Sequence, residues 1–177
     1  MSHYIGYPSS VCRAEFLPGT IVYNCTKCGG NLDVVLDYDQ IKQKYQIEDI
    51  ISRSDRSLWR YLPLLPVSDP GGEGTPIRVV GWTPLYSPPR LKETVKLDQL
   101  WIKDEGKNPT ASFKDRASAI VAARAKEINA ECIVTASTGN AGAALAGMSA
   151  ALGQKAVIFA PKNAPQAKIA QLLIYGA

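Results

Sequence analysis

Residues 103–116 read KDEGKNPTASFKDR, and this stretch predicts the junction of a strand and a helix on which the fold depends. The strand comes first, because residues 100–102 are bulky and apolar before charged residues and Gly106 end the run. Asn108-Pro109 predicts a turn, since proline fixes its own φ and moves the preceding residue out of the helical region. A helix is expected to begin directly after this turn.

The expected helix places Lys114 in its first turn. Thr110 or Ser112 can cap the helix start, and apolar residues then recur at helical spacing, namely Ala117, Ile120, Val121, Ala125 and Ile128. The positive end of the helix dipole favours an acid over a cation at such a position. A lysine placed there has a reason to lose its proton, and an uncharged lysine is a nucleophile that can form a Schiff base with a carbonyl compound.

A solvated lysine beside Asp115 is the ordinary alternative, because most lysines are exposed. The surrounding residues favour catalysis: Glu105 followed by NPTASFKDR at 108–116 closely resembles the pyridoxal-phosphate attachment site of the threonine synthase and serine/threonine dehydratase family. The form of the site looks most like that of the threonine synthases. Small departures in bulk occur where that family usually has glycine, at Ala111 and Ala117. The resemblance implies that Lys114 is the catalytic residue and that Lys114 and Phe113 contact the cofactor.

Length and composition bound the remaining interpretations. A chain of 177 residues that is 46% hydrophobic can bury one core, with room for an appendage. The net charge of +4 is mild and no basic run occurs, so we expect no nucleic-acid partner. No apolar segment reaches transmembrane length and the first residues do not read as a secretory leader, so we expect a cytoplasmic protein without a membrane partner.

The N-terminal cysteines resemble half of a metal-binding ribbon. Residues 25–28 read CTKC before two glycines, between expected strands at 20–23 and 32–36, whereas a redox Cys-x-x-Cys would normally open a helix. Some threonine synthases carry a similar zinc-ribbon-like segment with two Cys-x-x-Cys pairs. Here Ser9 and Glu15 occupy the positions at knuckle spacing around the third cysteine, and His3 could complete a site only with unusual spacing. We therefore expect a degenerate ribbon packed without zinc; the candidate ligands, if zinc binds, are Cys12, Cys25 and Cys28.

From residue 100 onward strands and helices alternate, which predicts a parallel α/β sheet. Strands are expected at 132–136 and 156–160, and because neither alternates polar with apolar residues, both should be covered on their two faces. Helices are expected at 141–152 and 164–175, each followed by a glycine. The fold class is therefore α/β, as part of a doubly wound parallel-sheet pyridoxal-phosphate enzyme fold with a small N-terminal ribbon-like β segment.

A second loop, at residues 137–140, joins the expected strand at 132–136 to the expected helix at 141–152. Its hydroxyls and N–H groups at the carboxyl end of a parallel strand make an anion site that suits an amino-acid carboxylate, although an ordinary helix cap would read the same. With Lys114 in the preceding unit, we expect the two loops to meet at one edge of the sheet. The resemblance implies that Asn140 contacts the cofactor and that the substrate is bound by Ser137, Thr138, Gly139 and Asn140. Many threonine synthases have threonine at the next position, where this chain has Ala141, which bears on substrate choice.

Three parts are expected along the chain: a ribbon-like segment at 1–38, a connecting segment at 39–76, and the start of the catalytic domain at 77–177. The family pattern continues with a glycine-rich loop for the cofactor phosphate and a Ser/Thr partner for the pyridine nitrogen. Neither is found after Lys114, so we expect a truncated or incomplete polypeptide.

The resemblance implies a pyridoxal-phosphate-dependent lyase, a threonine synthase that converts O-phospho-L-homoserine and water to L-threonine and phosphate. A threonine/serine dehydratase or related ammonia lyase is the alternative reaction. A non-catalytic truncated interaction module is the alternative of another class. The expected partner is a small amino-acid substrate, and a homodimer is left open.

Overall fold

The computed structural model describes residues 4–20 and 24–177, which divide into two units. One unit comprises residues 1–54 and 60–69, and the other comprises residues 55–59 and 70–177. The three-part division expected from the sequence, with boundaries after residues 38 and 76, stays a prediction.

The first unit contains a three-stranded antiparallel sheet in the order β2-β1-β3. Its strands are β1 (Tyr4–Pro8), β2 (Glu15–Phe16) and β3 (Val35–Leu36). Two short helices follow, α1 (Tyr38–Lys44) and α2 (Ile47–Ile51). Of the strand expected at 20–23, residues 21–23 lie outside the described part of the chain.

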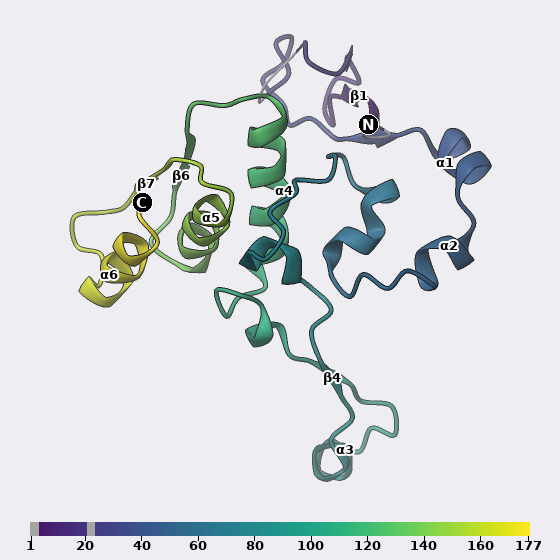
Figure 1. Cartoon of the computed structure of the whole chain (residues 1–177), viewed down its shortest axis with the longest axis vertical. Helices are drawn as coiled ribbons and strands as arrows, with labels where there is room; N and C mark the ends of the chain where they lie inside the picture. The colour runs from purple at the N-terminus through teal and green to yellow at the C-terminus, as the bar shows by residue number, and fades with distance from the viewer. Residues whose placement is uncertain (1–3, 21–23) are drawn as a thin grey trace. The chain divides into compact units, whose positions relative to one another are not determined.

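The second unit carries the elements around Lys114 (Figure 1). The 3-10 segment η1 (Leu58–Leu64) crosses from one unit to the other, and the remaining elements are η2 (Pro76–Val79), β4 (Leu85–Tyr86), α3 (Pro89–Val95), β5 (Ile102–Lys103), η3 (Glu105–Lys107), α4 (Lys114–Glu127), β6 (Ile133–Ala136), α5 (Asn140–Ala151), β7 (Ala156–Phe159) and α6 (Gln166–Ile174). Within the described ranges, no helix combines the length and the apolar character needed to cross a bilayer.

Strands β6 and β7 pair in parallel, with Ile133 opposite Ala156, which confirms the expected α/β pattern for this part of the chain. The preceding strand differs from that pattern, because β5 pairs antiparallel with β4 in a separate two-stranded ribbon. The expectation that both faces of β6 and β7 are covered is also wrong for the described structure. Alternate residues are exposed, including Phe159 at 64%, because α5 and α6 cover only the face that carries Ile158.

Helices α4 and α5 pack against each other through small residues (Figure 1). The buried face of α4 consists largely of alanines such as Ala119 and Ala122, whereas Val121 and Ile128 of the expected apolar set are 45% and 54% exposed. Alanine on a helix face permits a close approach of the neighbouring backbone, and α5 is likewise rich in alanine and glycine. The two helices that begin at Lys114 and Asn140 therefore form one tightly packed pair.

Gly147 of α5 brings this helix against the turn before Lys114. A Cβ built on Gly147 would lie 2.6 Å from Cγ2 of Thr110, closer than carbon atoms can pack. The absence of a side chain at Gly147 therefore fixes how near the Thr110 turn lies to the helix.

We predict that Gly147→Ala destabilises the chain by about 1–3 kcal/mol through overpacking, although alanine is the better helix former. Adding Thr110→Ser should restore most of the loss, because serine keeps the hydroxyl and removes the methyl group that would clash. Urea unfolding of the single and double variants measures the coupling. Ala150→Gly at an exposed position of the same helix calibrates the propensity effect, and a Gly147→Ala variant as stable as the parent would contradict the prediction.

Candidate active site

Lys114 is the first residue of α4, as the sequence predicts. The N-cap is Phe113, which makes no side-chain cap bond, so neither expected capping residue occupies that position. The backbone N–H of Lys114 donates to Oγ of Ser112 at 3.1 Å. The side chain of Lys114 is exposed, and its Nζ lies 6.0 Å from the centroid of the Phe113 ring. Across the described residues, Nζ has neither a hydrogen-bond acceptor nor an ion-pair partner. The amine is therefore accessible to a carbonyl compound.

Asp115, the neighbour of Lys114, is fully buried and has a structural role. Its carboxylate accepts the backbone N–H of Thr110 at 2.7 Å and also the Thr110 hydroxyl. A buried carboxylate is stable only where such donors replace its water, so this contact ties the turn to the first turn of α4. The turn includes Ala111 with φ of +56°, a left-handed conformation that glycine adopts without steric cost.

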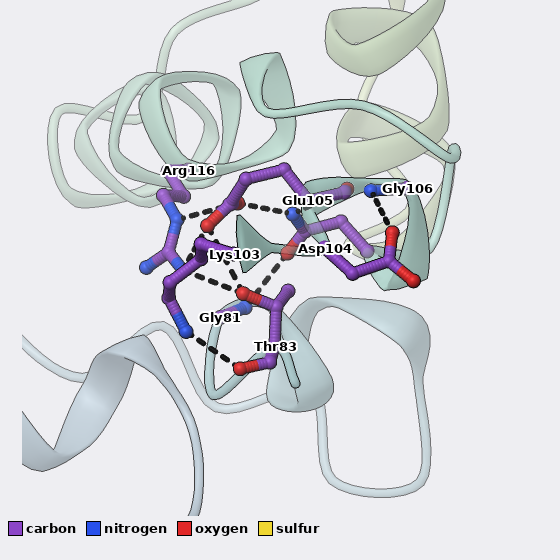
Figure 2. Close-up of polar contacts among 8 residues, drawn as sticks. Gly81, Thr83, Lys103, Asp104, Glu105, Gly106 and Arg116 are labelled. Carbon is purple, nitrogen blue, oxygen red and sulfur yellow. Dashed lines mark hydrogen bonds and ion pairs between the residues drawn. The ribbon is translucent and has the colours of Figure 1, made fainter. Parts of the chain in front are cut away.

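Glu105 and Arg116 form an ion pair that closes the loop around Lys114 (Figure 2). The guanidinium donates through two nitrogens to the two carboxylate oxygens, each at 2.9 Å, and the hydroxyl of Thr83 adds a third donor at 3.0 Å. The hydrogen bond from Arg116 is the main cause that lowers the pKa of Glu105 from 4.5 to about 2, against the opposing effect of burial. A two-point contact fixes the direction of Arg116, two residues along α4 from Lys114.

Asn108 holds the other side of the same loop. It is buried, its Oδ1 accepts the Gly81 N–H at 2.9 Å, and its amide donates to Oε2 of Glu105 at 2.7 Å. Lys103 donates to the carbonyl of Thr83 at 2.6 Å, which adds a second link between the loop and the segment at 81–83 (Figure 2). This network was not predicted from the sequence; its signal there is a turn asparagine between opposite charges at 105 and 116.

The second loop lies at the start of α5. Ser137 Oγ accepts the Gly139 N–H at 3.3 Å, and Oδ1 of Asn140 accepts from Lys168 Nζ at 3.4 Å. Thr138 is partly exposed beside them. A Cβ at Gly142 would come within 2.5 Å of the Ser137 carbonyl, so the loop is packed directly on the helix start. The loop and Lys114 thus lie at the starts of two helices that pack together, and the binding roles expected for Ser137, Thr138, Gly139, Asn140 and Phe113 stay predictions.

A cavity of about 590 Å³ borders the residues that precede Lys114. It is lined by Lys107 and Pro109 together with residues at 74–79. Neither Lys114 nor Ser137 lines it, so it is not the site that the two loops would form.

Three cysteines of the first unit converge in the structure. The Sγ atoms of Cys12, Cys25 and Cys28 all lie within 4.8 Å of one another. The pKa of Cys28 is lowered from 9.0 to about 6, chiefly by its hydrogen bond with the Ser9 hydroxyl and next by the Gly30 N–H. The three thiols could together hold a metal ion. His3 lies outside the described residues.

Comparison with known proteins decides the family. Residues 77–177, more than half of the chain, match the family described as pyridoxal-phosphate dependent enzyme. The chain belongs to the pyridoxal-phosphate-dependent enzyme family. It is 40% identical over 168 residues to the threonine synthase of Methanocaldococcus jannaschii and 39% identical over 168 residues to that of Methanosarcina acetivorans. Each alignment covers 94% of this chain and 40% of the relative, so the chain spans well under half the length of these curated proteins.

A solved structure of the pyridoxal-phosphate-dependent enzyme family is also similar. A pyridoxal 5'-phosphate-dependent aspartate racemase superposes with a TM-score of 0.50 at 36% identity, over 55% of this chain and 31% of that one. The donor chemistry of the described residues fits the cofactor: an exposed amine without an ion-pair partner among the described residues stands at the start of α4, and hydroxyl and N–H groups stand at the start of α5. Membership of the family thus identifies the cofactor as pyridoxal phosphate. The assignment of Lys114 as the residue that holds it stays a prediction.

We predict that the Glu105–Arg116 pair makes stability depend on acid pH. Because the folded pKa is about 2 and the ordinary value is 4.5, the stabilisation is full above pH 4.5 and is lost as pH falls from 4.5 toward 2. Glu105→Gln should lower the free energy of unfolding at pH 7 by about 1–3 kcal/mol, since charged hydrogen bonds are lost.

Denaturant unfolding at pH 7, 5, 4 and 3 measures the effect, with Glu93→Gln on exposed α3 as the matched control. The gap in free energy of unfolding between the parent chain and Glu105→Gln should narrow steadily below pH 4.5. A gap that stays constant down to pH 3 would show that the carboxylate of Glu105 is not responsible.

Proposed function

We propose that the protein is a threonine synthase, which releases phosphate from Cγ of O-phospho-L-homoserine and adds the hydroxyl of water at Cβ to give L-threonine and phosphate. The observation that carries the proposal is an exposed lysine amine at the start of α4, in a chain similar to threonine synthases over 94% of its length. The similarity extends beyond the catalytic segment, and it therefore supports this reaction over others in the same family.

The cofactor, when bound, supplies a ring that withdraws electrons from the substrate carbon beside the amine. Lys114 would hold the cofactor until the substrate amine takes its place. Its Nζ would then accept protons from the α and β carbons, and protons would be returned at the α and γ carbons, because threonine carries a methyl group at Cγ. Serine and backbone N–H groups of the loop at 137–140 bind the substrate carboxylate, and Asn140 orients the ring. The Glu105–Arg116 and Asp115–Thr110 contacts keep the lysine at the position that these transfers need.

The assignment of the reaction depends on finer sequence features than the assignment of the family does. The similar aspartate racemase is named for a different reaction. Ala141 also stands where a hydroxyl is common in similar threonine synthases. A threonine or serine dehydratase is the alternative that shares the lysine and the carboxylate loop. Cytoplasmic location, a homodimer and a small amino-acid substrate as partner stay predictions.

We predict that Lys114 is the residue that carries the cofactor. Incubating the protein with pyridoxal phosphate should give the visible absorption of a lysine-bound cofactor, and borohydride should then fix the label on the peptide that contains Lys114. Lys114→Ala should abolish both signals, whereas Lys107→Ala, which removes an exposed lysine of the same loop, should leave them unchanged. Labelling spread over many lysines, with none preferred, would favour a non-catalytic interaction module.

We also predict that the full-length protein releases phosphate from O-phospho-L-homoserine and forms threonine in equal amount. Lys114→Ala should lower kcat by roughly 10²–10⁴-fold, the range for loss of a positioned acid–base group. The parallel assay measures keto acid formed from threonine. Keto acid without phosphate release would make the dehydratase the correct assignment, while the family and the lysine role would stand.

A further inference from the structure

Two turns of the first unit, at residues 9–14 and 25–30, have the same backbone. In each, the N–H of the first residue donates to the carbonyl of the sixth, at 2.8 Å and 2.9 Å. The N–H of the fifth residue donates to the carbonyl of the first, at 3.1 Å and 2.8 Å. That fifth residue has a left-handed φ in both turns, +60° at Arg13 and +71° at Gly29. The likeness is structural, because only the second turn has the sequence of a metal knuckle.

The correspondence places Ser9 where the second turn has Cys25, and Cys12 where it has Cys28. The four side chains converge: Sγ of Cys12 lies 3.6 Å from Sγ of Cys25, and Oγ of Ser9 lies 3.4 Å from Sγ of Cys28. In a tetrahedral site with zinc–sulfur bonds of about 2.3 Å, sulfur ligands are about 3.8 Å apart. Both observed distances are close to the spacing expected of two ligands of one ion, and the three sulfurs lie within 4.8 Å of one another.

The hydroxyl of Ser9 is held as a ligand of a knuckle would be held. Ser9 is fully buried, and its Oγ accepts the N–H groups of Val11 and Cys12, both at 3.3 Å. In the other turn, Sγ of Cys28, the residue that corresponds to Cys12, accepts the Gly30 N–H at 3.4 Å. A neutral hydroxyl is a weaker zinc ligand than a thiolate, so this corner of the site can exchange with water.

We propose that the first unit binds one zinc ion through the thiolates of Cys12, Cys25 and Cys28, with the Ser9 hydroxyl as a weak, exchangeable fourth ligand. The ion links the two turns and thereby stabilises the small sheet, whose strands are only two to five residues long. This assignment differs from the metal-free ribbon expected from the sequence. The fold brings Cys12 together with Cys25 and Cys28, which lie 13 and 16 residues further along the chain, and it places the Ser9 hydroxyl at the fourth position.

The test is metal titration of the reduced full-length protein with zinc in competition with a chelating dye, and with cobalt as a spectroscopic probe. The parent should bind one equivalent of zinc, and cobalt should show thiolate charge-transfer absorption typical of three sulfur ligands. Cys12→Ser should weaken zinc at least about tenfold, the lower range for the loss of a group that supports a site. Cys132→Ser, which removes the exposed cysteine of the other unit, should change neither signal.

Ser9→Cys is the decisive variant, because a gain of affinity cannot come from misfolding. It should tighten zinc by at least about tenfold and raise the cobalt charge-transfer intensity by about one third, as a fourth thiolate is added. Failure of the parent to bind zinc overturns the site. Unchanged affinity and spectrum in Ser9→Cys, or loss of the metal in His3→Ala, overturns the assignment of Ser9 as the fourth ligand.

Discussion

The two-point ion pair between Glu105 and Arg116 is the contact on which the lysine loop depends. It joins the strand side of the loop to α4, so the helix cannot rotate about its axis without breaking both hydrogen bonds. Thr83 and Asn108 add donors to the same carboxylate, so each of its two oxygens accepts two hydrogen bonds in a partly buried site. The lysine itself needs no partner, because its backbone is positioned by the residues on both sides of it.

Small residues set the distances between the elements that carry the two loops. Alanines cover the buried face of α4, and glycine at 147 admits the Thr110 turn against α5. A larger residue at either place would move the lysine relative to the loop at 137–140, because close-packed interiors transmit a displacement instead of absorbing it. The same few positions thus decide both the packing of the helices and the placement of Lys114. Asp115, next to Lys114, serves the placement alone, since it contributes only hydrogen bonds to the turn.

The first unit follows a different principle of stabilisation. Its strands are short and much of its apolar surface is exposed, including Ile5 and Leu17. Cross-links between turns can replace a large core in so small a sheet, and side chains at 9, 12, 25 and 28 are grouped in the way such a link requires. The similarity to threonine synthases covers this unit as well as the catalytic segment, since it extends over 94% of the chain.

The sequence by itself determined the features that depend on neighbours along the chain. Lys114 in the first turn of a helix, a helix start within one residue of Asn140, the parallel pair β6 and β7, and the glycines at 153 and 176 after their helices follow from local turn chemistry and periodicity. Only the tertiary structure decided that Asp115 is buried, that β5 pairs with β4, and that one face of β6 and β7 is open. It also decided that Glu105 meets Arg116 and that Ser9 joins three cysteines. The reason is physical: periodicity reports which face of an element is apolar, whereas the partner of a polar group depends on which distant segment the packing brings to it.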